Sequence, residues 1–295
     1  MKNRILITLL LVGIFYISQA QDDLMQLLEA NTTESANYTV QTFKGTRLIN
    51  GQTIETRGKG ELEFIFSHRF GALSLGSYEL FGLDQAFVRY GLEYALTDRI
   101  GIGAGRNSVD KTVDGYLRYK VLRQQSGLKD VPVTITAFGY LGVRTSPRKE
   151  EASFDITLAD RMAYTTQLLI ARKFSSFSLQ LMPTFVHKNT VDQSIENNEN
   201  LILGFGGRLR VAPSVSITGE YYKRLNVNEN SPYYDPLGLG VAIETGGHIF
   251  ELVLTNTRGL TERAFLTETT GDLGNGDIHF GFNITRTFQL NKENR

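Results

Sequence analysis

A strict two-residue alternation runs through Val88-Arg89-Tyr90-Gly91-Leu92-Glu93-Tyr94, where charged or small residues take the odd positions and apolar residues the even ones. The same alternation recurs at Leu62-Glu63-Phe64, at Leu117-Arg118-Tyr119-Lys120-Val121 and from Ile217 to Tyr221. Successive side chains of a β-strand point to opposite faces, so each segment has one apolar and one polar face. A barrel in lipid requires this division in every strand, because lipid covers one face and the lumen the other. The pattern therefore predicts an all-β chain that forms a transmembrane antiparallel barrel.

Turn signals divide the chain from Gly60 onward into twelve expected strands. Tight turns such as Thr97-Asp98 and Gly246-Gly247 alternate with longer polar loops such as 145–159 and 257–276. Short periplasmic turns and longer extracellular loops are typical of single-chain outer-membrane barrels, so we expect an up-and-down barrel of about twelve strands. The expected strands are 60–69, 86–96, 99–106, 112–122, 132–144, 160–173, 177–188, 200–211, 214–224, 238–245, 248–256 and 277–290.

The alternation also assigns side chains to the two faces of the wall. A basic side chain at the bilayer midplane costs about 2–4 kcal/mol, which gives this sorting an energetic cause. We expect lumen charges on neighbouring strands to pair, Glu63 with Arg89 and Arg210 with Glu220. The expected lumen-lining residues, which are also the pore candidates, are Glu63, Arg89, Glu93, Arg118, Lys120, Arg208, Arg210, Glu220, Glu244 and Glu251. The expected lipid-facing residues include Phe64, Phe66, Tyr90, Leu92, Leu203, Phe205, Leu252 and Phe282.

The N-terminus has the pattern of a secretory signal peptide. Lys2 and Arg4 precede an apolar run from Ile5 to Ile17, and Ser18-Gln19-Ala20 supplies small residues for cleavage near Ala20. The run is shorter than the about 20 apolar residues that a spanning helix needs. The chain has no cysteine, which excludes a lipoprotein anchor and a disulfide framework. Together with the barrel pattern, this predicts the outer membrane of a Gram-negative bacterium.

Three parts follow from these observations: residues 1–20 as signal peptide, 21–59 as an N-terminal extension and 60–295 as the barrel. The extension contains Tyr38 to Ile49, followed by a hairpin-like Asn50-Gly51. An additional hairpin, a periplasmic extension and a plug folded into the lumen all fit this pattern.

Composition and spacing argue against several functions. The 31 basic residues balance 31 acidic ones, so there is no basic footprint for nucleic acid. His68, His187, His248 and His279 have no metal-ligand spacing and no cysteine to complete a zinc site, so we expect no metal and no cofactor. His187 is predicted to face outward near the loops, as in an outer-membrane phospholipase, but the sequence around it lacks a closely spaced serine nucleophile. We therefore expect no catalytic residue, and an outer-membrane lipid hydrolase is the third-ranked function.

The lumen carries the main functional expectation. Eight strands leave an interior that side chains fill and sixteen to eighteen leave a water channel, so twelve strands do not decide the matter. Glycines at 101–105 and 204–207 lie within strands, where we expect them to permit curvature or to keep the lumen open locally. Balanced lumen charges predict no selectivity for ions of one sign. We expect a passive or weakly selective small-solute channel; the alternative is a non-conducting barrel that presents loops 145–159 and 257–276 to a partner or surface.

The last expected strand carries Phe288 near its end, before the five polar residues Asn291 to Arg295. Barrel-assembly machinery commonly reads a terminal strand that ends in an aromatic residue, so Phe288 is a candidate assembly signal. The expected partners are this machinery, outer-membrane lipid and a small solute.

One segment resembles the start of a known family. It is Thr42-Phe43-Lys44-Gly45-Thr46-Arg47-Leu48-Ile49-Asn50, followed by Glu61 to Phe66 and by His68-Arg69-Phe70-Gly71. It resembles an uncharacterised Gram-negative barrel family, domain of unknown function 5777, and so does the later Gly246-Gly247-His248 with Phe250. The likeness covers essentially the mature chain. It implies an outer-membrane barrel with no established activity, so no catalytic residues carry over.

Overall fold

The protein is described here by a computed structural model that covers residues 36–127, 129–146 and 156–290. The predicted signal peptide, the middle of loop 145–159 and the polar tail after Leu290 lie outside the described residues. Two units are distinguished within the chain. In the smaller one, β1 (Asn37–Tyr38) pairs with β6 (Gln125–Ser126) in antiparallel fashion. The larger unit comprises Thr39–Gln124 together with the chain from Val131 onward.

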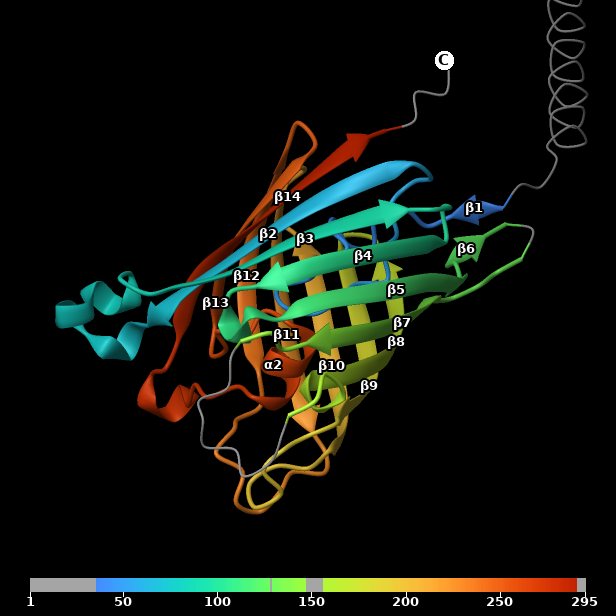
Figure 1. The fold of residues 1–295 in the computed structure, drawn as a ribbon. Helices are drawn as coiled ribbons and strands as arrows, with labels where there is room; N and C mark the ends of the chain where they lie inside the picture. Colours follow the sequence, from blue (N-terminus) through green and yellow to red (C-terminus); the bar gives the residue numbers. More distant parts are fainter. Residues whose placement is uncertain (1–35, 128, 147–155, 291–295) are drawn as a thin grey trace, which may run out of the picture. The chain divides into compact units, whose positions relative to one another are not determined.

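Twelve antiparallel strands close this unit into a barrel (Figure 1). The prediction of a twelve-stranded barrel is confirmed, and each strand overlaps one of the twelve expected segments. The ring closes between β14 and β2, where Gln289 lies opposite Glu61. The strands, in their order around the barrel, are β10 (Glu199–Arg210), β11 (Val215–Arg224), β12 (Leu237–Thr245), β13 (His248–Thr255), β14 (His279–Gln289), β2 (Glu61–Ala72), β3 (Ala86–Ala95), β4 (Ile100–Asn107), β5 (Val113–Leu122), β7 (Thr134–Val143), β8 (Met162–Phe174) and β9 (Phe177–Lys188).

The two rims of the barrel differ in their connections. The short-turn rim carries tight turns such as 175–176 and 246–247. The loop rim carries longer segments, which contain the short helices of the described residues. These helices are η1 (Leu73–Leu75), η2 (Ser77–Gly82), η3 (Val109–Lys111), η4 (Ala159–Arg161), α2 (Glu262–Thr267) and η5 (Leu273–Asn275). No helix in the described part of the chain is long and apolar enough to cross a membrane.

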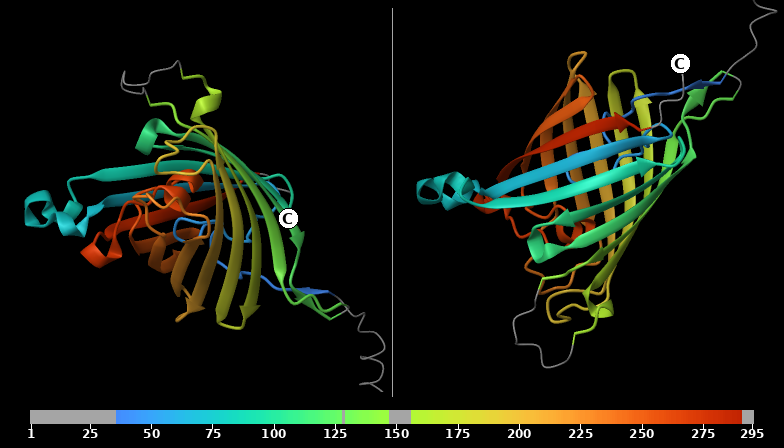
Figure 2. Two further views of the ribbon diagram at one scale, coloured as in Figure 1. Left: turned by 90° about the horizontal axis from the view of Figure 1, so that it is seen from below. Right: turned by 45° about the horizontal axis from the view of Figure 1, so that its top comes forward.

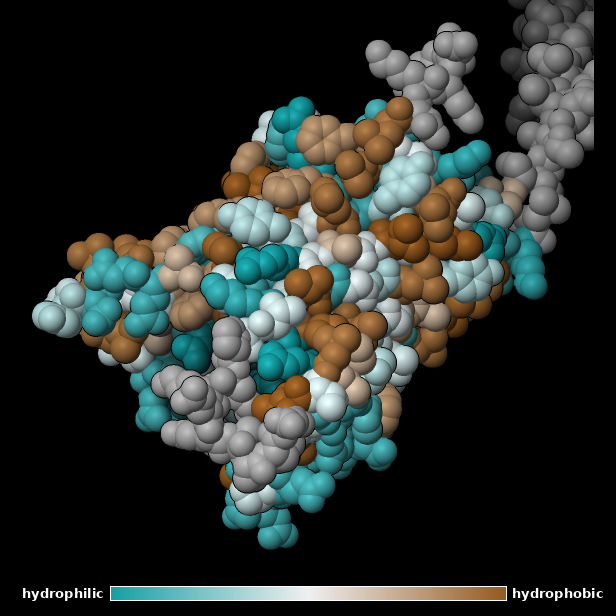
Figure 3. All heavy atoms as spheres, in the orientation of Figure 1, coloured by the Kyte–Doolittle hydropathy of each residue, from teal (hydrophilic) through white to brown (hydrophobic). Residues whose placement is uncertain are grey.

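The outer face of the wall is apolar along the strands. All eight residues expected to face lipid point outward, and Tyr90, Phe205 and Leu252 are 51%, 47% and 52% exposed. Figure 3 shows apolar residues gathered over the β3–β5 side of this wall, with hydrophilic residues over the loops at the bottom of the view. An apolar outer face is what a barrel needs in order to lie in hydrocarbon.

Leu252→Arg should destabilise the barrel in a bilayer by about 2–4 kcal/mol, because a guanidinium at mid-wall must be desolvated. Leu290→Arg is the depth control. Leu290 is 55% exposed just beyond the end of β14, where the cost of an arginine falls to about 0–1 kcal/mol. The free energy of unfolding from urea titration in liposomes checks both values. Equal losses for the two variants would contradict the assignment of the outer face.

Candidate functional site: the filled lumen

Residues 39–59, here called the inserted segment, precede β2, and residues 42–57 of this segment lie inside the barrel (Figure 2, blue), whereas Val40 and Lys59 near its two ends are exposed. Phe43, Leu48, Ile49 and Ile54 of this segment are at most 3% exposed. Asn50-Gly51 lies at its tip, in a turn closed by the Leu48 amide, which donates to the Gly51 carbonyl at 2.9 Å. The segment therefore occupies the space that a solute would have to cross.

Glu220 of β11 holds the tip through backbone groups. Its carboxylate accepts hydrogen bonds from the amides of Ile49, Asn50 and Gly51 at 3.3, 2.8 and 3.0 Å. Position 51 requires glycine, because a Cβ there would lie 1.7 Å from the hydroxyl oxygen of Tyr222. One wall carboxylate thus satisfies three consecutive donors that no strand or helix pairs.

Arg69 of β2 bonds the same tip from the other side. Its guanidinium donates to the Ile49 carbonyl at 3.1 Å and to Asn50 Oδ1 at 2.9 Å. Arg69 is fully buried, and its inward position follows the same alternation as Glu63. Arg69 is not among the predicted lumen residues, although its parity in β2 identifies it as one.

Arg118 of β5 holds the stem of the inserted segment. Its guanidinium donates to the Thr53 and Glu55 carbonyls at 3.1 and 2.8 Å and to Gln52 Oε1 at 2.5 Å, and it forms an ion pair with Glu93 at 2.9 Å. Arg118 and Glu93 are at most 1% exposed. Glu93 of the wall therefore balances the charge of Arg118, whereas most of the N–H groups of Arg118 donate hydrogen bonds to the inserted segment.

Two further wall residues bond the segment through its main chain. Gln180 of β9 accepts from the Ile54 amide at 2.9 Å and donates to the Gln52 carbonyl at 2.8 Å. Arg208 of β10 donates to the Gln41 carbonyl at 3.0 Å and, from Nε, to Ser216 at 3.0 Å. Gln180 is not among the predicted lumen residues, because neutral polar side chains alternate less visibly than charges.

From the loop rim, α2 enters the lumen and meets the inserted segment. Leu260, Phe265 and Leu266 are at most 2% exposed. Glu262 is fully buried; its Oε1 accepts a hydrogen bond from Gln52 Nε2 at 2.5 Å and lies 3.4 Å from Arg47 Nη2. The lumen is thus filled from both ends, by two parts of the chain that touch at Glu262.

The expectation that loop 257–276 is presented outward is wrong for its α2 portion. The apolar side chains of α2 pack into the lumen, where the ring of Tyr222 meets Phe265 edge-on at 5.4 Å. Arg258, Thr270 and residues 273–276 remain on the surface, and Leu273 is 45% exposed. The reason is hydrophobic burial: Phe265 and Leu266 join one buried apolar cluster with side chains of the wall and of the inserted segment, among them Tyr222.

Ion pairs near the loop rim hold α2 and the end of its loop in place. Buried Lys188 pairs with Glu196 and lies 3.9 Å from Glu268, which also accepts Arg263 at 2.7 Å. Tyr233 donates its hydroxyl to Glu196 at 3.4 Å. Burial, and then the nearby Glu196 carboxylate, raises the pKa of Tyr233 to about 12.

The structure places all ten expected lumen residues on the inner side of the wall by register. Eight are buried, whereas Glu244 is partly exposed beside Lys44 and Arg210 is exposed at the short-turn rim. Whether they line a conducting pore stays a prediction. The eight buried ones are Glu63, Arg89, Glu93, Arg118, Lys120, Arg208, Glu220 and Glu251.

Both predicted pairs between neighbouring strands are wrong. Glu63 lies opposite Glu93 and pairs with Arg57 of the inserted segment, and Arg210 lies opposite Ser216. Glu220 lies opposite Gly206 and binds the segment instead. The inserted segment therefore takes up charges that the sequence pattern paired within the wall.

Other pairs reach across a whole strand. Arg89 of β3 forms two bonds to Asp114 of β5, at 2.9 and 2.5 Å, and they pass over β4. A Cβ on Gly105 of β4 would lie 2.3 Å from Arg89 Nη2, and one on Gly103 would lie 2.1 Å from the Tyr116 ring. The expectation that these glycines keep the lumen open is therefore wrong, because large side chains from β3 and β5 fill the space above them.

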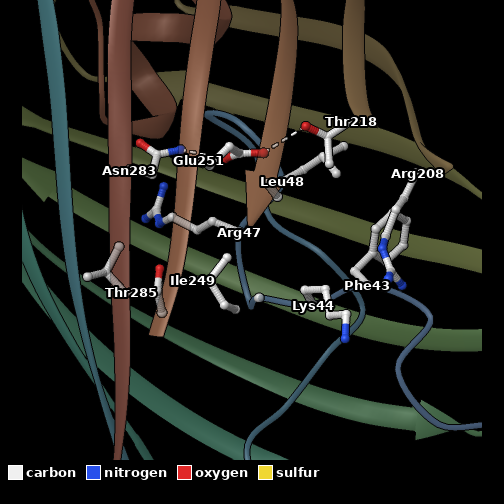
Figure 4. A pocket seen from close by; sticks show the side chains of 13 residues that line it. Phe43, Lys44, Arg47, Leu48, Arg208, Thr218, Ile249, Glu251, Asn283 and Thr285 are labelled. Carbon is white, nitrogen blue, oxygen red and sulfur yellow. Dashed lines mark hydrogen bonds between the residues drawn. The ribbon is translucent and has the colours of Figure 1, made fainter. Parts of the chain in front are cut away.

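Little free volume remains inside the barrel. A cavity of about 30 Å³ lies between Phe43, Lys44 and Arg47 of the inserted segment and the wall residues Arg208 and Glu251. Figure 4 shows the side chains that line it. A water needs roughly 10–15 Å³ of such volume, so this cavity holds two or three waters at most. A larger space of about 210 Å³ lies between the base of the segment and Asp98, Lys120 and Thr134 of the wall. Within the described residues, the inserted segment and α2 thus occupy most of the lumen.

The four histidines lie apart. His68 stacks on Phe282 on the outer face, and the His187 ring lies 6.3 Å from that of Tyr164. His279 Nδ1 lies 2.9 Å from the Phe70 carbonyl. The residues that the structure describes contain no group of three or more His, Cys, Asp or Glu that could hold a metal ion.

The sequence matches the family model DUF5777, described as a membrane-bound β-barrel domain, over residues 43–288. The chain belongs to this family. Because the match begins at Phe43, the family domain includes most of the inserted segment as well as the wall. The predicted family is confirmed. No curated protein matches the sequence.

Several solved barrels have a similar fold. The NanC porin has a TM-score of 0.48 at 9% identity, covering 78% of this chain and 100% of its own. An outer-membrane channel from Pseudomonas putida F1 has a TM-score of 0.48 at 11% identity, covering 80% and 98%. Outer membrane phospholipase A from Escherichia coli has a TM-score of 0.40 at 9% identity, covering 77% and 92%. No residue role is carried over from these likenesses.

Proposed function

We propose that the protein is an outer-membrane channel for small solutes that the inserted segment keeps closed. One observation carries this proposal: the segment is not a strand of the wall, and wall side chains hold it mainly through its backbone amides and carbonyls. Water can replace these hydrogen bonds when the segment leaves the lumen. The channel can therefore open without leaving the polar groups of the wall and the segment unpaired. The expected signal peptide and the family's membrane-bound character support the outer-membrane location.

The wall beneath the segment indicates the class of solute. Arg69 and Arg118 would become free together with Glu63 and Glu220, so an open lumen presents both signs of charge. Selectivity for ions of one sign requires a lining of one sign. Neutral or zwitterionic polar solutes fit this lining best.

A second function, presentation of a surface loop by a non-conducting barrel, has one observation in its favour. In the β2–β3 loop, which contains η1 and η2, the side chains of Tyr78, Leu80 and Phe81 are 93%, 56% and 54% exposed. Exposed apolar groups of this kind mark interaction sites. The presented surface would then be loop 73–85, whereas the α2 loop folds inward.

Glu220→Ala should produce channel openings in planar bilayers, because the amides of Ile49, Asn50 and Gly51 lose their shared acceptor. Each buried donor left unpaired costs about 1–3 kcal/mol, which favours release of the tip into water. Conductance of the purified variant against the unaltered protein checks this result.

A reversible cross-link provides the control. A Cβ on Gly238 would lie 3.0 Å from Cγ2 of Ile49, so the pair Ile49→Cys and Gly238→Cys brings the two Cβ atoms within disulfide range. The chain has no other cysteine. In the Glu220→Ala background, the oxidised pair should be silent and a reductant should restore the openings. Openings that persist in the cross-linked protein would contradict gating by the segment, and silence in every folded variant would favour loop presentation.

A further inference from the structure

A groove of about 470 Å³ indents the outer face of the wall over β8–β10, in the half towards the loop rim. The side chains that form it are Thr166, Leu168, Pro183, Phe185, Leu201, Leu203 and Leu225. Gln167, Thr184 and Ile202 also border it, although their side chains point into the barrel, so the floor of the groove is the backbone of the wall. We call this feature the wall groove.

Pro183 explains why the wall is indented at this point. Gln167 pairs with Thr184 and Ile170 with Leu181 between β8 and β9, but the two positions between them are unpaired. One of these positions is Pro183, which has no N–H to donate. Proline is normally confined to edge strands and bulges, whereas β9 is paired on both sides. The interruption leaves a shallow opening in the ladder, which the outer side chains do not cover.

The inner side of the wall compensates for the interruption. Thr184 donates its hydroxyl to the Met182 carbonyl at 2.9 Å and accepts from Gln167 Nε2 at 2.9 Å. Met182 and Leu169 are fully buried behind the opening. The break in the ladder is therefore supported by side chains from inside, and the wall keeps its register on both sides of it.

We propose that the wall groove binds one acyl chain of a membrane lipid in a fixed position. The groove is continuous with the apolar outer face of a membrane-bound barrel, and no charged side chain lines it. Its volume lies in the range of about 300–1,000 Å³ that is typical of small-molecule sites. Since lipid is as apolar as the groove, binding comes from the contacts that a chain makes with Leu168, Phe185 and Leu203 on a concave surface.

Fluorescence quenching by brominated lipid tests this site. The chain has no tryptophan, so Leu201→Trp places a unique fluorophore at the edge of the groove, and Leu252→Trp places one on the wall away from it. Both variants are reconstituted in bilayers with increasing fractions of phospholipid brominated on its acyl chains. Quenching of the groove tryptophan should be half-complete at a several-fold lower brominated fraction than quenching of the Leu252→Trp control.

Thr166→Phe is the matched variant in which the groove is filled and the proposed site is lost. Thr166 is exposed and points outward, so a phenyl group fills the groove without entering the barrel. Leu201→Trp combined with Thr166→Phe should give the quenching curve of the Leu252→Trp control, while its circular dichroism and gel mobility stay those of the folded barrel. Identical curves for the two single-tryptophan variants would mean that only freely exchanging lipid covers the groove, and this would overturn the proposal. Excess quenching that survives Thr166→Phe would overturn it as well.

Discussion

Deleting residues 39–59 should turn a silent barrel into one that carries steady current in a planar bilayer. The inserted segment occupies the lumen and buries Phe43, Leu48, Ile49 and Ile54 there. Without it, the charged side chains of the inner wall face water. A barrel of twelve strands is wider than the eight-stranded barrels that side chains alone fill. Single-channel conductance of the full chain and of the deletion variant measures the change.

Because α2 closes part of the loop rim, a second deletion separates its contribution. Replacing residues 259–270 by a short glycine-serine linker removes Phe265 and Leu266 from the lumen. The double variant should conduct more than the variant that lacks residues 39–59 alone. Deleting only the α2 loop should leave the barrel closed, since the segment still fills the lumen. A folded double variant without current, with folding shown by heat-modifiable gel mobility, would rule out the channel.

Arg118→Met should lower the free energy of unfolding by about 3–5 kcal/mol, the loss expected when one partner of a buried ion pair is removed. The substitution leaves the Glu93 carboxylate buried and removes the donors to the Thr53 and Glu55 carbonyls. A methionine fills similar space but satisfies none of these groups. Urea titration in liposomes, followed by tryptic protection of the barrel, measures the loss.

Two controls define this result. Arg99→Met removes an exposed arginine in the neighbouring turn, and its effect should stay within about 0.5 kcal/mol. Arg118→Met combined with Glu93→Met removes the stranded charge and should be less destabilised than Arg118→Met alone. If the double variant loses the sum of the two single losses, Arg118 and Glu93 do not act as a pair.

Much of the wall could be predicted from the sequence because its signals are local. Strand parity has a period of two residues, so Arg89, Tyr90, Leu92 and Glu93 fix the two faces of β3 without knowledge of any other strand. Turn signals such as Gly246-Gly247 then set the number of strands. Arg210 shows the limit of this reasoning: its parity is inward, but its place at the strand end leaves it exposed.

The partners inside the lumen could not be predicted in this way. Strand parity predicts pairs of charges between neighbouring strands, whereas Arg89 reaches Asp114 across the glycines of β4. The tip at Asn50-Gly51 was equally compatible with an extra hairpin, a periplasmic extension and a plug. The side chains around this tip follow neither the strand period nor the helix period. They therefore do not show whether the segment folds into the lumen or away from it.

The sequence alone thus determined the wall: twelve strands, their two faces and the membrane that surrounds them. Only the tertiary structure decided what fills the barrel, because those contacts join residues far apart in the chain. Ile49 and Glu220, for example, are 171 positions apart. Such contacts form between a side chain and a backbone group, and a backbone group is the same at every position of a sequence. A pattern of residue types cannot specify from which backbone amides a buried carboxylate will accept hydrogen bonds. Closure of the barrel brings those amides within hydrogen-bond distance of the carboxylate.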